Sequence, residues 1–304
     1  MKRLLLILLF AAALLPQMGS AQRQTGGQKP HFAYVNMPMH IVSPELQRQY
    51  MIEHYWDNFN FADTQFIERI EEVEMLRAYA TFVQHFVGPT DSEPIRRLMQ
   101  RASASRKMMD YFVRLGEKVL HDPNSPLRSD ELYIAVLEAQ IASPHYDEYE
   151  KMAPKYDLQL ARQNRIGHKA NDLIYTTADG KRHKLHDITS RYTLLYINNP
   201  GCPMCRDITE ALRRSGIIGK KTASGELTIV CLYPDEELDA WRKELSAMPT
   251  TWIHSYDHGC VIRQSNSYDL RAIPSLYLLD SEKRVLLKDC TDVRLVEQTL
   301  IQTF

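Results

Sequence analysis

The chain has 304 residues, of which 44% are hydrophobic and 25% charged, as in ordinary globular proteins. Its formal net charge is −1 at neutral pH, a balance that does not suit nucleic-acid binding and excludes nucleic acid as an expected partner. Five cysteines are too few for a disulfide-stapled scaffold, so a hydrophobic core must supply the stability.

The first segment has the layout of a secretory signal peptide. Lys2 and Arg3 precede an apolar run over Leu4–Leu15, and Gly19-Ser20-Ala21 offers a cleavage site. The run is shorter than the roughly 20 residues that span a bilayer. We therefore expect a signal peptide over residues 1–21, a periplasmic protein and no stable membrane insertion. A retained N-terminal anchor is the alternative.

A polar stretch follows and predicts a flexible leader over residues 22–42. Apolar residues then recur at helical spacing, which predicts an all-α domain over residues 43–165 whose role the sequence leaves open. One long helix, capped by Asp63, is expected to carry Phe66, Ile70, Val73, Ala80 and Val83 on one face. Aromatic residues in this half are interpreted as core rather than as a binding surface: Tyr50, Tyr55, Trp56, Tyr79 and Phe86.

The pattern changes after Gly167, and residues 166–304 predict an α/β domain. Asp179-Gly180 is a strong hairpin signal between two short strands. Beyond it, apolar strands alternate with amphipathic helices, and a second hairpin precedes a terminal helix. The expected fold is a mixed sheet sandwiched by helices. The strands are expected at 193–198, 227–232, 275–279 and 284–287, and the helices at 204–214, 235–247 and 293–303.

Two cysteines stand where the strand at 193–198 gives way to a helix. If Cys202 is the N-cap, Pro203 occupies the first helical position, where its missing N–H costs nothing. Cys205 is then the third helical residue. The orphan N–H groups of the first turn and the helix dipole favour a thiolate at Cys202, and the thiolate is the attacking species in disulfide exchange. Cys205 is placed to resolve the resulting mixed disulfide.

Gly201, Met204, Arg206 and Asp207 surround this pair. Arg206 adds positive charge that Asp207 offsets. A structural disulfide is an alternative interpretation, but it would not require a strand-to-helix junction. Half of a zinc site is another, although no second Cys-x-x-Cys follows.

Together with Ile273-Pro274 before a late strand and the Asp-Gly hairpin, the Cys202-Pro203-Met204-Cys205 motif resembles the thioredoxin-like superfamily. The resemblance is strongest to TlpA/ResA-like extracytoplasmic thiol–disulfide oxidoreductases and covers residues 166–304. The helical half is similar to an uncharacterised domain found fused to thioredoxin-like domains.

The resemblance implies that the Ile273–Pro274 bond is cis and faces the cysteines, and that both residues bind an extended substrate segment by strand addition. A trans proline at an ordinary strand start is the alternative. The chain departs from the family in Gly201, where members usually have Trp, and in Tyr196, where thioredoxin has a buried acid. Members often have an acid shortly after the motif, for which Asp207 and Glu210 are the candidates.

The remaining cysteines have several possible roles. Cys231 lies in an apolar strand and is interpreted as an inert thiol. Cys260 either pairs with Cys290 in a second disulfide or relays oxidation from the active pair. His254, His258 and Cys260 lie within seven residues and could hold a metal, but a hydrophilic loop is the preferred interpretation. Neither metal nor cofactor is expected.

The sequence thus predicts an enzyme that exchanges disulfides with protein thiols and with an upstream redox partner. A thioredoxin-fold binding module with little turnover is the alternative, motivated by the missing tryptophan. A peroxide reductase is a third hypothesis, disfavoured because Pro200-Gly201 precede the cysteine where such sites usually have a threonine.

Overall fold

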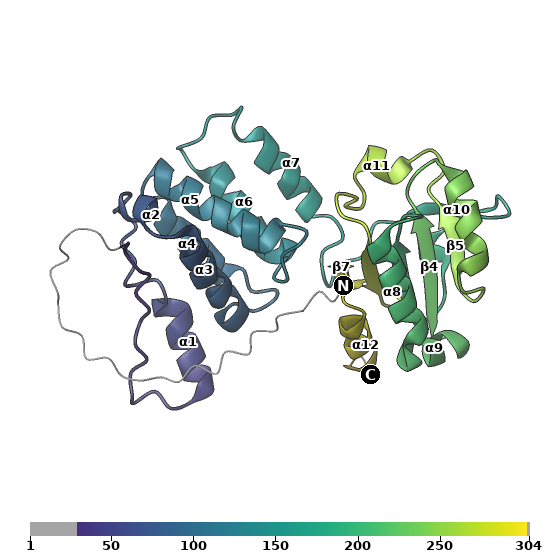
Figure 1. Cartoon of the computed structure of the whole chain (residues 1–304), viewed down its shortest axis with the longest axis horizontal. Helices are drawn as coiled ribbons and strands as arrows, with labels where there is room; N and C mark the ends of the chain where they lie inside the picture. Colours follow the sequence, from purple (N-terminus) through teal and green to yellow (C-terminus); the bar gives the residue numbers. More distant parts are fainter. Residues whose placement is uncertain (1–28, 303–304) are drawn as a thin grey trace, which may run out of the picture.

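The structure, a computed structural model, describes residues 29–302. These residues form a helical N-terminal half and an α/β C-terminal half that lie side by side (Figure 1). The predicted signal peptide over residues 1–21 lies outside the described part of the chain. Among the described residues, no helix has the length and apolar character needed to cross a membrane.

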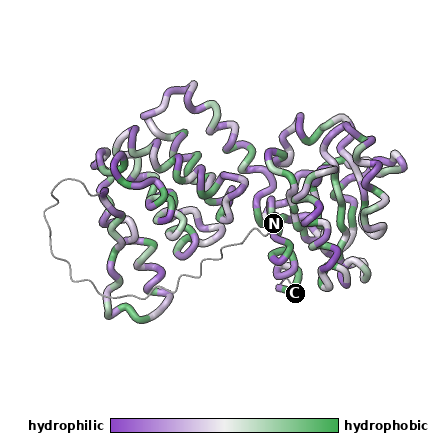
Figure 2. Tube along the Cα trace, viewed as in Figure 1, coloured by the Kyte–Doolittle hydropathy of each residue, from purple (hydrophilic) through white to green (hydrophobic). Residues whose placement is uncertain are grey.

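The helical half packs its elements around one hydrophobic core. Hydrophobic and hydrophilic residues alternate along its helices, as amphipathic packing requires (Figure 2). Its elements are α1 (Pro44–His54), α2 (Phe66–Arg69), α3 (Glu72–Phe86), α4 (Glu93–Ala102), α5 (Arg106–Gly116), the π-helical turn η1 (Glu117–His121), α6 (Asp130–Ala142) and α7 (Met152–Ala161).

The prediction of one long helix from Phe66 to Val83 is wrong, because the chain breaks between α2 and α3. Ile70 is extended, with ψ at 146°, and its side chain is buried in the core. This break shifts the helical phase, so that Val73 points to solvent and is 62% exposed. Asp63 is not the N-cap, which is Gln65, although its carboxylate accepts the N–H of Phe66 at 3.1 Å.

The aromatic residues of this half lie mainly in the core, as the sequence analysis expected. Tyr55, Trp56 and Tyr79 are fully buried. Phe32, from the C-terminal part of the predicted leader, is also buried and its ring lies 5.3 Å from that of Trp56. Its N–H donates to Glu74 at 2.8 Å, so this stretch packs on the helical half.

The C-terminal half confirms the predicted α/β sandwich around a mixed sheet. Within the described residues the sheet has seven strands in the order β2-β1-β5-β4-β3-β6-β7. The strands are β1 (Ile174–Thr177), β2 (Arg182–Lys184), β3 (Tyr192–Ile197), β4 (Leu227–Tyr233), β5 (Ile253–Tyr256), β6 (Ser275–Leu279) and β7 (Val285–Cys290). The helical elements are η2 (Leu185–Asp187), α8 (Pro203–Arg214), α9 (Gly216–Ala223), α10 (Leu238–Glu244), η3 (Leu245–Ala247), α11 (Val261–Ser265) and α12 (Val293–Gln302).

Alternating strand residues supply two cores, one on each face of the sheet. Helices α8, α9 and α12 cover one face, and α11 with several loops covers the other. Strands β3, β4 and β5 are parallel, so their C-terminal ends lie at the same end of the sheet. Ligands and reactive groups of α/β folds usually lie there.

The segment that joins the halves runs along the outer edge of β7. Gly167 donates its N–H to the carbonyl of Val285 at 2.8 Å, and Val285 donates to His168 at 2.9 Å. Ala170 continues the contact by donating to Lys283 at 2.8 Å. The predicted division at residues 165/166 falls in this segment, between α7 and β1.

Candidate functional site

The candidate site lies where β3 gives way to α8. All six residues of β3 are buried, which fixes the end of the strand at Ile197. The chain then turns through Asn198–Gly201 into the helix. Gly201 has φ at +73°, in the left-handed region that a side chain with a Cβ adopts only at a cost. This conformation gives a physical reason for glycine at the position where the resembling family usually has tryptophan.

The start of α8 has the capping arrangement that the sequence predicts. Cys202 is the N-cap with extended backbone, and Pro203 is the first helical residue. The sulfur of Cys202 accepts the N–H of Cys205 at 3.3 Å. Cys202 is half-buried and Pro203 and Met204 are exposed, so a partner molecule has access to the first sulfur.

The second cysteine is in a different environment. The Cys205 side chain is buried, and its sulfur accepts the N–H of Asn199 at 3.4 Å. Burial raises the pKa of the Cys205 thiol to about 12, with smaller raising contributions from Cys202 and from the Glu244 carboxylate. The Asn199 N–H acts in the opposite direction. At neutral pH Cys205 is therefore a protonated thiol.

Tyr196, at the position where thioredoxin has a buried acid, fastens the active-site helix to the sheet. Its hydroxyl donates to the carbonyl of Cys205 at 2.7 Å and lies 3.1 Å from the hydroxyl of Thr209. Burial raises the pKa of this phenol well above its ordinary value, so it remains a neutral donor. Tyr196 thus has a structural role in place of the missing acid.

A pocket of about 420 Å³ opens beside Cys205 between α8 and η3. Asp207 and Glu210, the acids that the sequence analysis proposed, both line it, and Glu210 is paired with Arg214 at 2.6 Å. A third acid lines the same pocket: Glu244, at the end of α10, accepts the N–H of Gly201 at 2.7 Å. Sequence reasoning missed Glu244 because it lies 39 residues after Cys205 and carries no motif.

The strand register brings Ile273 and Pro274, the predicted substrate-binding residues, to the same end of the sheet as the cysteines. Ser275, directly after Pro274, pairs with Ile197 at the end of β3. The Ile273–Pro274 bond is cis, as the resemblance implies. Arg206 is exposed, Pro274 is buried and Ile273 is half-buried. Ile273 and Pro274, which are predicted to contact a substrate, directly precede β6. The two cysteines follow β3, the strand that pairs with β6, so both groups lie at the same end of the sheet.

The three other cysteines are also free thiols. Cys231 is buried in β4, which raises its pKa well above the ordinary value. The predicted alternative of a Cys260–Cys290 disulfide is wrong for the folded chain. Both thiols are free. Cys260 follows β5 and Cys290 ends β7, and these two strands are separated by three others in the sheet.

The alternative of a metal at His254–Cys260 finds no support in the side-chain positions. The Nε2–H of His254 donates a hydrogen bond to the carbonyl of Pro249 at 2.8 Å. In the part of the chain that the structure describes, no group of three or more His, Cys, Asp or Glu residues is arranged to hold a metal ion.

Comparison with known proteins relates both halves to other chains. Residues 13–164 match the family model described as a domain of unknown function, DUF5106. A crystal structure of a thioredoxin-like protein from Bacteroides caccae is 42% identical, with a TM-score of 0.84, and the match covers 90% of this chain and 99% of that one.

Two further relatives match less than half of the chain. The C-terminal domain of an uncharacterized protein from Bacteroides fragilis is 46% identical over 46% of this chain and 99% of that one, with a TM-score of 0.44. A probable nucleoredoxin 3 from rice is 27% identical over 124 residues, which are 41% of this chain. The match spans about a quarter of that curated relative, 26% of its length.

Proposed function

Since the chain belongs to the thioredoxin-like proteins that carry an N-terminal DUF5106 domain, we propose that it is a periplasmic thiol–disulfide oxidoreductase that acts through Cys202 and Cys205. The observation that carries the proposal is the pair of sulfurs at the start of α8. Cys202 is accessible and receives a backbone N–H, whereas Cys205 is buried three residues later. This asymmetry supports one attacking and one resolving sulfur.

In the proposed reaction the Cys202 thiolate attacks one sulfur of a partner's disulfide. A mixed disulfide forms, and the partner's other sulfur leaves as a thiolate that takes up a proton. Cys205 then loses its proton and attacks the Cys202 sulfur, which forms the Cys202–Cys205 disulfide and releases the partner's second thiol. Two electrons pass from the cysteine pair to the partner, and an upstream redox partner, itself oxidised in the exchange, supplies two others that reduce the Cys202–Cys205 disulfide again. The reverse sequence delivers a disulfide.

Ile273 and Pro274 are proposed to bind the partner's extended backbone next to the sulfurs. Gly201, Pro203 and Met204 would form the rest of the contact surface, and Arg206 and Asp207 its charged border. The adjacent ends of β3 and β6 support this placement, as does the exposure of Met204.

The test is a trapping experiment with the full chain. Replacing Cys205→Ser removes the resolving sulfur, so mixed disulfides at Cys202 should accumulate in a periplasmic extract and disappear on reduction. The matched control is the double variant Cys202→Ser/Cys205→Ser, which should trap nothing. If no adduct forms and the unmodified protein reduces no disulfide, the proposal fails in favour of a binding module.

A further inference from the structure

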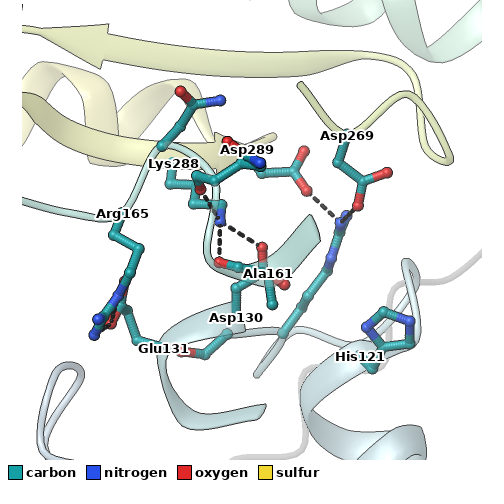
Figure 3. A network of polar contacts seen from close by, with 12 residues as sticks. His121, Asp130, Glu131, Ala161, Arg165, Asp269, Lys288 and Asp289 are labelled. Atoms are coloured by element: carbon teal, nitrogen blue, oxygen red, sulfur yellow. Dashed lines mark hydrogen bonds and ion pairs between the residues drawn. The ribbon is translucent and has the colours of Figure 1, made fainter. Parts of the chain in front are cut away.

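A cluster of charged residues joins the two halves of the chain, and the proposed redox chemistry does not use it (Figure 3). Its members come from η1, α6, α7 and the turn before α6 on one side, and from the segment before β6 and the end of β7 on the other. We call it the interface cluster, and it consists of His121, Arg128, Asp130, Asp157, Asp269, Arg271, Lys288 and Asp289.

Arg128 from the helical half is shared by two carboxylates of the other half. Its guanidinium lies 3.5 Å from a carboxylate oxygen of Asp269 and contacts Asp289 directly. The Asp269 and Asp289 side chains are only 4% and 8% exposed. Arg128 thus brings a cation from the helical half to both buried carboxylates, which favours contact between the halves at this point.

The segment that precedes the proposed substrate-binding residues contacts the helical half through Arg271. Arg271 donates its backbone N–H and its side chain to Asp269, at 2.9 and 2.8 Å. The same guanidinium reaches the carboxylate of Asp157 in α7 at 2.9 Å. It also lies 3.1 Å from His121, whose ring stacks on Tyr133. Asp269 and Arg271 are therefore fastened to the helical half just before Ile273.

A bulge in β7 directs the side chains of Lys288 and Asp289 toward the helical half. Leu276 pairs with Cys290 and Leu278 with Leu287, so β7 contains one extra residue in this interval. Asp289 has φ at +48°, and such bulges redirect side chains out of a regular strand. Lys288 reaches Asp130 at 2.8 Å, with both side chains 6% exposed, and donates to the carbonyl of Ala161 at 2.8 Å.

We propose that the DUF5106 domain positions the substrate-binding loop of the redox site, with Arg128 and Asp157 as positioning residues that act through Asp269 and Arg271. The inference rests on the proposed function of Ile273 and Pro274. Arg271 precedes Ile273 by two residues, and Ser275 is fixed against the end of β3. The short span between them is thus anchored by the helical domain on one side and by the sheet on the other.

The test uses full-chain variants. Arg128→Gln and Asp157→Asn each remove a charge that crosses the interface, and Arg128→Lys is the conservative rescue. The matched control is Arg162→Gln, because Arg162 pairs with Glu138 at 2.7 Å inside the helical domain and is 53% exposed. Hydrogen exchange over residues 266–276 should be roughly tenfold faster in the two test variants, as local opening becomes easier, and unchanged in the control.

Disulfide reduction, with insulin as the substrate, separates positioning from general structural damage. Both variants should raise KM by about fivefold to tenfold while kcat changes by less than about twofold, and alkylation of Cys202 by iodoacetamide should not change. Arg128→Lys should recover most of the KM. If Arg128→Gln does not fold, Asp157→Asn decides, because that side chain is 27% exposed.

Wild-type hydrogen exchange and wild-type KM in Asp157→Asn would overturn the inference. The proposed function has a separate criterion: an unmodified protein that exchanges no disulfides overturns it. In that case the hydrogen-exchange measurement, which needs no turnover, still decides whether the helical domain holds the loop.

Discussion

The redox site and the interface cluster both bury polar groups, but they stabilise them by opposite means. At the start of α8 each sulfur receives a backbone N–H, at 3.3 Å for Cys202 and 3.4 Å for Cys205. In the interface cluster, charged side chains meet charged side chains, as Lys288 meets Asp130.

The difference follows from what each region has to do. A sulfur in disulfide exchange gains and loses charge, and a backbone dipole can serve it in both states without leaving an ion unpaired. A buried ion pair loses stability as soon as one charge disappears. Ion pairs therefore suit a contact that stays the same throughout the reaction, and backbone donors suit atoms that change.

The largest effect is expected at the first sulfur. Cys202→Ser should lower disulfide-reductase activity at least about a thousandfold, because a serine hydroxyl is not ionised and forms no disulfide. Cys290→Ser is the matched control, since Cys290 is a partly exposed free thiol outside the pair, and it should keep wild-type activity. Equal losses in both variants would contradict the special position of Cys202. Insulin reduction provides the measurement.

Stability should respond most at the interface cluster. Lys288→Met leaves the buried Asp130 carboxylate without its cation, which should lower the free energy of unfolding by about 3–5 kcal/mol. The control is Lys155→Met, because Lys155 pairs with Glu148 on the surface, with side chains 49% and 80% exposed. Such an exposed pair contributes little to stability, because solvent screens it. Urea unfolding monitored by circular dichroism distinguishes the two, and similar losses would mean that burial does not matter here.

A smaller effect tests the backbone of the redox site. Gly201→Ala places a Cβ at φ +73°, which should cost about 1–2 kcal/mol although no atom lies within 4 Å of that Cβ. Gly219→Ala, in α9 and also without neighbours, should instead stabilise by about 0.5–1 kcal/mol. Thermal unfolding of both variants measures the difference. A stabilising Gly201→Ala would show that the left-handed turn is not needed.

The smallest effect concerns the charge beside Cys205. The Glu244 carboxylate raises the pKa of this thiol, so Glu244→Gln should lower it from about 12 by up to about one pH unit. More Cys205 thiolate is then present at any given pH, and its NMR Cβ titration shifts to lower pH. Glu210→Gln lines the same pocket and is the control, with no shift expected. An unchanged or higher midpoint in Glu244→Gln would contradict the electrostatic role.

The fold of the redox half could be predicted because its signals are local. Asp179-Gly180 marks a hairpin, the strand at 193–198 is continuously apolar, and Cys202-Pro203 marks a helix start. The helix break at Ile70 could not be predicted, because the extended backbone there depends on burying Ile70 in a core that exists only after folding. Helix α9 was not among the predicted helices: after the helix expected at 204–214, Ser215 caps a new helix by accepting the N–H of Ile218 at 3.1 Å.

The site residues could likewise be predicted only where their signal is local in the sequence. Cys202, Cys205 and the Ile273–Pro274 step carry recognisable spacing. Glu244 and the interface cluster do not, since Arg128 and Asp269 are 141 residues apart and ordinary surface charges look identical in sequence. Contacts of this kind become visible only once the strand order places β6 and β7 next to the helical domain.

The linker that follows the edge of β7 has a consequence for assembly. Sheet edges offer unpaired N–H and C=O groups that can join with another chain into an intermolecular sheet. Here the backbone of residues 167–170 pairs with part of the edge formed by β7. The opposite edge, β2, is three residues long and consists of Arg182, His183 and Lys184, all exposed, and basic side chains discourage edge-to-edge association. Across the described sheet, both borders are thus protected against aggregation by strand pairing.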